Sequence, residues 1–330
     1  MVSRSLGIAF SPLERRRELI VELATLAETC GYDQVALGEG WSWDVHLMLA
    51  EIAAATENIK LVSTVVSVYS RSAASIAMSA ATLSVQTDGR YLLGLGASSE
   101  ALTEGFHDVD YVAPVRHLRR SVRQTRALLQ GERHELSREA RALRLGVDRI
   151  PPVPIYIAAL APRALRAAGE LAEGWLPFLV PPEQLGSFIE AMGEGRSARP
   201  PELTKTIRVA PAIPTIVSQD EGAARTVMEK FASTYLLAMG EFYGPFLERI
   251  GFETEVAAIR AANTRPSDGV VPPAGQRLLE QQTIFGTRDR AQERLAEWYR
   301  LGADEPLLML PPGAPAELLR ETVESMAASG

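Results

Sequence analysis

Cysteine is almost absent from this 330-residue sequence, and its single occurrence is Cys30. One cysteine can form neither an internal disulfide nor a thiolate metal cluster. The sequence also has no HExxH motif, no dense group of carboxylates and no Cys/His spacing of the zinc type. No serine stands in the G-x-S-x-G context of a nucleophile elbow. These absences predict a protein without a metal centre and without a serine-hydrolase site.

Long apolar runs are missing as well. The first ten residues contain Arg4 and pass directly into a short strand-like run, so we expect neither a signal peptide nor a membrane span. The formal net charge is −7, and the basic residues form no stripe. A mildly acidic surface of this kind is not typical of proteins that bind nucleic acid or anionic membranes. The sequence therefore predicts a cytoplasmic protein with a small-molecule partner.

The apolar content is sufficient for a full hydrophobic core. Apolar residues make up 46% of the sequence and charged residues 23%, which are ordinary values for a globular protein. The length exceeds that of most single domains, but α/β barrels commonly exceed about 250 residues as one unit. We expect one domain over residues 1–330.

Strand-like and helical segments alternate along most of the chain. Near-continuous apolar strands separated by amphipathic helices predict a parallel sheet closed as a (β/α)8 barrel. An open doubly wound sheet fits less well, because no Gly-rich dinucleotide motif follows the first strand. The expected strands are residues 6–10, 34–38, 61–66, 91–95, 155–160, 175–179, 207–217 and 305–310, and the helical segments include 15–29, 73–82, 115–129 and 162–171.

Two spacings are longer than a minimal barrel needs. Insertions are expected at about residues 99–153, after the fourth strand, and 219–303, after the seventh. Long excursions in a compact domain tend to form lids or interfaces.

The segment 151–177 is the most informative part of the sequence. It has the pattern of a buried strand that ends near Ala158, a tight loop, a helix with Pro162 in its first turn, and a further strand. The amino end of a helix beside the carboxyl end of a parallel strand suits a phosphate or another anion. An ordinary βαβ crossover that binds nothing has the same pattern.

Unusual residues follow two other expected strands, at the end of the barrel where active sites lie, and a histidine lies farther along the chain. Glu39 precedes Trp41 and Trp43, whose indoles can wall a flat pocket or simply pack in a loop. The run 97–99, Ala-Ser-Ser, allows close approach of a ligand, although the serines can equally cap a helix. His107 is the histidine in a plausible site, with either a proton-transfer or a structural role.

The chain as a whole resembles the luciferase-like monooxygenase superfamily, in particular its branch of oxidoreductases that use the deazaflavin coenzyme F420. Segments 104–107 (EGFH) and 157–162 (IAALAP) favour the deazaflavin over FMN. The resemblance is carried, in order, by 31–36 (GYDQVA), 54–61 (AATENIKL), 80–83 (AATL), 88–96 (DGRYLLGLG), 104–107, 151–175 and 285–287 (FGT).

This resemblance implies where the cofactor F420, or FMN as the alternative, would bind. Relatives carry a non-proline cis peptide behind the tricyclic ring, which corresponds here to Thr64-Val65, and an acidic residue near the head group, which corresponds to Glu39. The phosphate-bearing tail would lie on the backbone after the fifth strand. The remaining cofactor-binding residues that the resemblance implies are Ala97, Ser98, Ser99, Ala158, Ala159, Leu160, Ala161 and Arg163.

The sequence departs from the family pattern at two positions. Some sugar and alcohol dehydrogenases of the family have a catalytic histidine where Gly40 stands, and Ala161 replaces the usual glycine. The expected activity is therefore hydride transfer between F420 and a small organic substrate, with reduction of a C=C or C=N bond. Glu39 and His107 are the expected catalytic residues, and Trp41 and Trp43 the expected substrate contacts.

Two other functions remain open from the sequence. An FMN-dependent monooxygenase would share the fold and activate O₂ instead. A non-catalytic barrel that holds a flavin is the other alternative, which Gly40 and Ala161 leave possible. A homodimer is the expected assembly.

Overall fold

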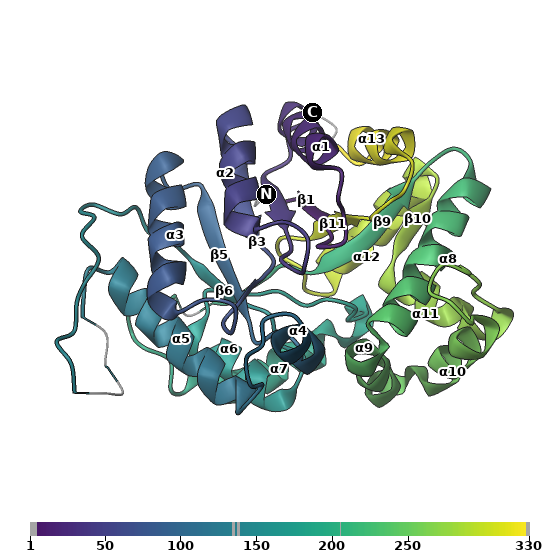
Figure 1. Ribbon diagram of the computed structural model, residues 1–330. Helices are drawn as coiled ribbons and strands as arrows, with labels where there is room; N and C mark the ends of the chain where they lie inside the picture. The colour runs from purple at the N-terminus through teal and green to yellow at the C-terminus, as the bar shows by residue number, and fades with distance from the viewer. Residues whose placement is uncertain (1–4, 134–135, 137–138, 205, 328–330) are drawn as a thin grey trace.

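The strands of the computed structural model form one parallel sheet that curves into a barrel (Figure 1). The structure describes residues 5–133, 136, 139–204 and 206–327. The sheet order is β10-β9-β11-β1-β2-β3-β5-β6-β7-β8, and β4 also pairs with β5. A bridge between Phe178, just beyond β7, and Ala212 joins the end of this path back to β9. The parallel α/β barrel predicted from the sequence is confirmed.

The strands are short and almost completely buried. Their bounds are β1 Gly7–Phe10, β2 Gln34–Leu37, β3 Lys60–Ser63, β4 Val66–Ser67, β5 Tyr91–Gly96, β6 Ile155–Ile157, β7 Gly174–Trp175, β8 Arg208–Val209, β9 Ala212–Val217, β10 Ile284–Gly286 and β11 Leu307–Leu310.

Helices surround the sheet and supply the connections between strands (Figure 1). Side chains of Asp44, Ser72 and Asp220 accept hydrogen bonds from backbone amides and so cap α2, α3 and α8. In the part of the chain that the structure describes, no helix is both long and apolar enough to cross a membrane. The helices are α1 Arg17–Thr29, α2 Val45–Ala55, α3 Ala73–Gln86, α4 Glu100–Gly105, α5 Pro114–Leu129, α6 Pro162–Leu171, α7 Leu185–Arg196, α8 Glu221–Ala238, α9 Gly240–Leu247, α10 Glu253–Ala262, α11 Gln276–Gln282, α12 Arg288–Arg300 and α13 Ala316–Ser325, with short turns at Pro182–Gln184, Glu248–Phe252 and Pro273–Gly275.

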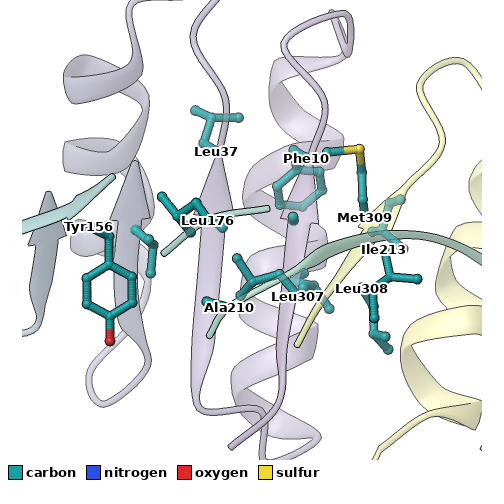
Figure 2. Packing of buried hydrophobic residues seen from close by; sticks show 14 of the residues in the cluster. Phe10, Leu37, Tyr156, Leu176, Ala210, Ile213, Leu307, Leu308 and Met309 are labelled. Atoms are coloured by element: carbon teal, nitrogen blue, oxygen red, sulfur yellow. The ribbon is translucent and has the colours of Figure 1, made fainter. Parts of the chain in front are cut away.

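Large buried side chains pack together in the core, among them Phe10 of β1, Met309 of the neighbouring β11 and Leu176, just beyond β7 (Figure 2). At the amino ends of the strands, the Tyr156 hydroxyl donates to Glu305 at 2.8 Å, and Arg208 Nε donates to the same carboxylate at 3.1 Å. This polar cluster occupies the amino-terminal end of the barrel. A ligand site is therefore expected at the carboxyl ends of the strands.

Several expected strands differ from the structure in their extent, and the run 155–160, for example, ends at Ile157. The run 61–66 is divided into β3 and β4 by a cis peptide between Thr64 and Val65. The run 207–217 is divided into β8 and β9 near Pro211, which has no amide hydrogen to donate. The run 175–179 shortens to β7, because Pro177 likewise lacks a donor.

The two insertions lie where the sequence predicted them. Residues 99–153 contain α4 and α5, and residues 219–303 contain α8 to α12. The second insertion also contains β10, which was not predicted as a strand. Three residues are too few to show a period, and β10 pairs only with the carboxyl half of β9.

Candidate active site

The cis peptide Thr64-Val65 lies at the centre of the candidate site. Val65 packs directly against the backbone of Gly96, because a Cβ atom added to that glycine would lie 2.6 Å from Val65 Cγ2 and 3.7 Å from Ala158 Cβ. The carboxyl ends of β3, β5 and β6 therefore meet at this point. The cis peptide that the resemblance implied is confirmed. Glycine at position 96 is needed because a larger residue would overlap with the Val65 side chain.

A buried chain of hydrogen bonds reaches Ser63, the residue directly before this peptide. His46 Nε2 lies 3.2 Å from the Tyr91 hydroxyl, which lies 3.0 Å from the hydroxyl of Ser63. Ser63 in turn accepts from the amide of Gly94 at 2.9 Å. Burial, and secondly the charge of Arg71, lower the pKa of His46 to about 4. His46 is therefore neutral at physiological pH.

Glu39 is held in an ion pair that the sequence did not reveal. Arg71 Nη1 lies 2.6 Å from Glu39 Oε1 and donates to Oε2 at 2.7 Å, while Nη2 donates to Asp44 at 2.6 Å. The Ser70 hydroxyl also donates to Glu39 at 3.4 Å. One guanidinium thus fixes two carboxylates at the ends of β2 and α2. The only sequence signal for Arg71 was its place between β4 and the cap of α3.

Trp41 and Trp43 are 48% and 38% exposed, so neither is core packing. The loop that carries them is fixed by Ser42, whose hydroxyl donates to the Pro12 carbonyl at 2.6 Å. A Cβ atom at Gly40 would lie 2.9 Å from Pro12 Cβ. Contact with Pro12 is the structural reason for glycine at the position where some relatives have histidine.

The turn after β5 brings Ser98 and Ser99 into different roles. Ser99 caps α4, accepting from the Leu102 amide at 3.4 Å, so the helix-cap interpretation holds for this residue. Ser98 has a left-handed backbone with φ 61°. Its carbonyl accepts from the Tyr111 hydroxyl at 3.2 Å. The resulting turn leads the chain away from Ala97 and into the first insertion.

His107 follows α4 and has a buried Nε2 atom without a hydrogen-bond partner among the described residues. Its ring packs edge-on to Phe106, with 5.0 Å between ring centroids. Over the described part of the chain, no hydrogen bond joins His107 to Glu39. The catalytic roles of these two residues stay predictions.

The amino end of α6 has the form that the sequence predicted. Pro162 is the first helical residue, and Ala161 precedes it without a side-chain cap. The Trp175 indole donates to the Ala159 carbonyl at 2.9 Å and so fixes the preceding turn. The amides of Leu160 and Ala161 have no acceptor among the described residues. Arg163 is exposed beside them.

Comparison with known proteins identifies the family of the chain. The family profile described as luciferase-like monooxygenase matches residues 11–305. The chain therefore belongs to the luciferase-like monooxygenase family, as its sequence blocks predicted.

Two relatives of similar length have names that give a cofactor or a reaction. A Mycobacterium tuberculosis protein with the provisional name coenzyme F420-dependent oxidoreductase is 25% identical over 331 residues, covering 91% of this chain and 92% of its own. A 5,10-methylenetetrahydromethanopterin reductase of Archaeoglobus fulgidus is 27% identical, covering 93% of each chain.

Solved structures of the same fold use more than one cofactor. The F420-dependent tetrahydromethanopterin reductase of Methanopyrus kandleri superposes with a TM-score of 0.73 at 18% identity, covering 98% of this chain and 97% of that one. An FMN complex of the oxygenating component of 3,6-diketocamphane monooxygenase from Pseudomonas putida gives the same score, identity and coverage. At these identities the likeness concerns the fold alone.

Proposed function

We propose that this protein is an F420-dependent oxidoreductase that exchanges a hydride with a small organic substrate. The observation that carries the proposal is the meeting of Val65, Gly96 and Ala158 at the cis peptide, next to the free amides before α6. A flat ring could lie against Val65, and an anionic tail could bind to the free amides. The name of the Mycobacterium tuberculosis relative favours F420 as the cofactor.

The described residues fit such a cofactor in their chemistry. Thr64 Oγ1 is buried without a hydrogen-bond partner at the cis peptide, so a polar ring atom can satisfy it. The amides of Leu160 and Ala161, together with the positive end of the α6 dipole, suit a phosphate. Arg163 can add a charged hydrogen bond at the same place.

The bound deazaflavin supplies the hydride chemistry at C5 of its ring. The protein supplies position and charge. Val65, which packs against Gly96, would contact the ring, and the ion pair of Glu39 with Arg71 would set the electrostatic field at the ends of β2 and β4. His107 and Glu39 are the candidates for moving a proton. Trp41 and Trp43 cover the substrate and limit its contact with water.

Reduction of a C=C or C=N bond is the proposed reaction. Gly40 provides no acid or base where some dehydrogenases of the family have histidine, and its contact with Pro12 leaves little room for one. The named reductase activity of the Archaeoglobus fulgidus relative is consistent with this direction of hydride transfer.

Titration of the purified protein with F420 and, separately, with FMN tests the proposal. We expect tighter binding of F420 at a single ionic strength, measured by cofactor fluorescence. Tighter binding of FMN together with oxygen consumption would instead make the protein a monooxygenase. Binding of a cofactor without turnover of any substrate in a broad panel would indicate a non-catalytic flavin-binding barrel.

We further propose that the protein forms a homodimer through the outer face of α2 and α3, which lie next to each other (Figure 1). Leu47 on α2 and Met78 on α3 are 73% and 61% exposed, and Val85 extends the same apolar surface. The helix α3 contains no charged residue. Because the chain carries a net charge of −7, an uncharged face is where two copies meet with the least repulsion.

A further inference from the structure

The second insertion is fastened to the barrel at the carboxyl ends of β1 and β7. The Tyr235 hydroxyl on α8 lies 3.1 Å from the hydroxyl of Ser11, the first residue after β1. Gln282 at the end of α11 donates to the carbonyl of Leu179, four residues after β7, at 3.1 Å. These contacts hold the insertion over the end of the barrel at which the cis peptide lies.

Five aromatic rings meet where the insertion contacts the barrel, and we call them the aromatic wall. Phe178, just beyond β7, packs edge-on against Tyr235 at 5.2 Å and against Tyr243 at 5.4 Å between ring centroids. Phe231 lies 4.5 Å from Tyr235, and Phe242 lies 5.0 Å from Tyr243. The wall therefore combines one residue of the barrel with residues of α8 and α9.

The two tyrosine hydroxyls of the aromatic wall differ in their partners. Tyr235 is engaged with Ser11, whereas the Tyr243 hydroxyl makes no hydrogen bond to any residue that the structure describes. Burial raises the pKa of Tyr235 to about 12 and also raises the pKa of Tyr243, with the nearby Tyr235 as a second cause for the latter. Both phenols therefore stay protonated at neutral pH, and the Tyr243 hydroxyl has no partner among the described residues that would compete with a ligand.

We propose that the aromatic wall is the substrate site and that Tyr243 donates a hydrogen bond to a carbonyl oxygen of a planar, conjugated or aromatic substrate. Phe231 and Tyr235 are buried, whereas Phe242, which packs on Tyr243, is 45% exposed. This open part of the wall suits a π-system, which aromatic rings bind in edge-to-face or offset contacts. A phenol with no protein partner suits an acceptor on that ligand. The inference rests on the proposed function only in taking this end of the barrel as the place of reaction.

Tyr243 would also polarise the carbonyl group of the substrate during the reaction. When a hydride from the reduced deazaflavin adds to the far carbon of the conjugated C=C bond, the π bond breaks and its electrons move toward the carbonyl oxygen. The hydrogen bond from Tyr243 stabilises this negative charge. A proton taken up at the carbon next to the carbonyl completes the reduction. Tyr243 thereby selects carbonyl-conjugated double bonds over isolated ones.

A pair of probes that differ in one oxygen tests this contact without turnover. Acetophenone carries the carbonyl, and ethylbenzene has a similar shape without it. Binding of each probe to the parent protein and to Tyr243→Phe is measured by calorimetry or ligand-observed NMR. We expect the parent to prefer acetophenone by about three- to tenfold, the usual worth of a neutral hydrogen bond, and Tyr243→Phe to lose this preference.

Tyr32→Phe is the matched control, since it removes a tyrosine hydroxyl that donates to the Val323 carbonyl at the α1–α13 contact, away from the aromatic wall. It should keep the preference for acetophenone. Equal binding of both probes to the parent protein, or a preference that survives in Tyr243→Phe, overturns the inference. Failure of F420 to bind, with the probe results as expected, would reject the proposed function and leave the Tyr243 contact standing.

Discussion

Glu39 and Arg71 show how one contact changes the interpretation of a residue. The sequence offered Glu39 as a free carboxylate at a strand end, and the structure gives it two short contacts with one guanidinium. The ion pair therefore makes the Glu39 carboxylate a fixed and well-positioned charge. His107, with its unpartnered Nε2, keeps a nitrogen available for proton transfer.

Glu39→Gln and His107→Asn separate these roles. At least one of the variants should lower the turnover rate by about a hundredfold to ten-thousandfold, the usual worth of general acid or base catalysis. F420 affinity should change much less, as measured by fluorescence titration. If both variants bind F420 normally and turn over substrate within a few-fold of the parent, the proton comes from solvent or substrate.

His46 predicts a dependence of stability on pH. A histidine in the unfolded chain titrates near about 6.5, whereas burial and Arg71 lower the pKa of His46 to about 4. Between these values the unfolded state binds more protons, so the contribution of neutral His46 is complete above about pH 6.5 and is lost as the pH falls toward 4.

We expect urea unfolding to show this loss as about 2 kcal/mol between pH 8 and pH 5. His46→Gln keeps a polar side chain beside Tyr91 and removes the titration. Its free energy of unfolding should fall less over the same range. Parallel pH profiles for the parent and the variant would show that His46 does not titrate with folding.

The helix α6 is the element whose amino end we propose as the place of the cofactor's phosphate. Its bounds are those predicted from the sequence, Pro162–Leu171, and it packs closely on α7. A Cβ atom at Gly169 would lie 2.0 Å from the Met192 carbonyl oxygen. This close packing fixes the helix axis and with it the direction of the free amides before Pro162.

Ala161→Pro removes one of these amides and is compatible with the backbone angle of that residue, φ −90°. F420 should bind about tenfold to a hundredfold more weakly, because a hydrogen bond to a charged group is lost. Arg163→Ala should matter less, unless its guanidinium also reaches the phosphate. Unchanged affinity in a folded Ala161→Pro protein, verified by circular dichroism, would move the tail away from α6.

The assembly of the whole molecule depends on its outer helices. Most of them carry charges on their exposed sides, as α12 does with its alternating arginines and glutamates. The face of α2 and α3 differs, with an exposed leucine, methionine and valine and only Glu51 among its charges, already paired with Arg17.

Leu47→Glu combined with Met78→Glu should convert the proposed homodimer to a monomer, because burying two unpaired carboxylates against their copies is costly. Size-exclusion chromatography with light scattering measures the mass. Leu143→Glu is the control, since Leu143 is equally exposed but lies in the first insertion. A parent that is monomeric, or a double variant that stays dimeric, would contradict this interface.

The sequence by itself determined the parallel barrel, both insertions, the helix α6 and, through its resemblance to the family, the cis peptide at Thr64-Val65. These follow from hydrophobic period, proline position and ordered sequence blocks, all of which act over short stretches of chain.

Only the tertiary structure decided the contacts between distant segments. Arg71 reaches Glu39 across 32 residues, and Tyr235 reaches Ser11 across 224. No local pattern encodes such pairs, because they depend on barrel closure and on where each insertion returns to the sheet. The strand β10 was not predicted, because its extended conformation depends on pairing with β9 and not on its own composition. The aromatic wall arises in the same way, because α8 and α9 bring their rings to Phe178, which is distant in the sequence.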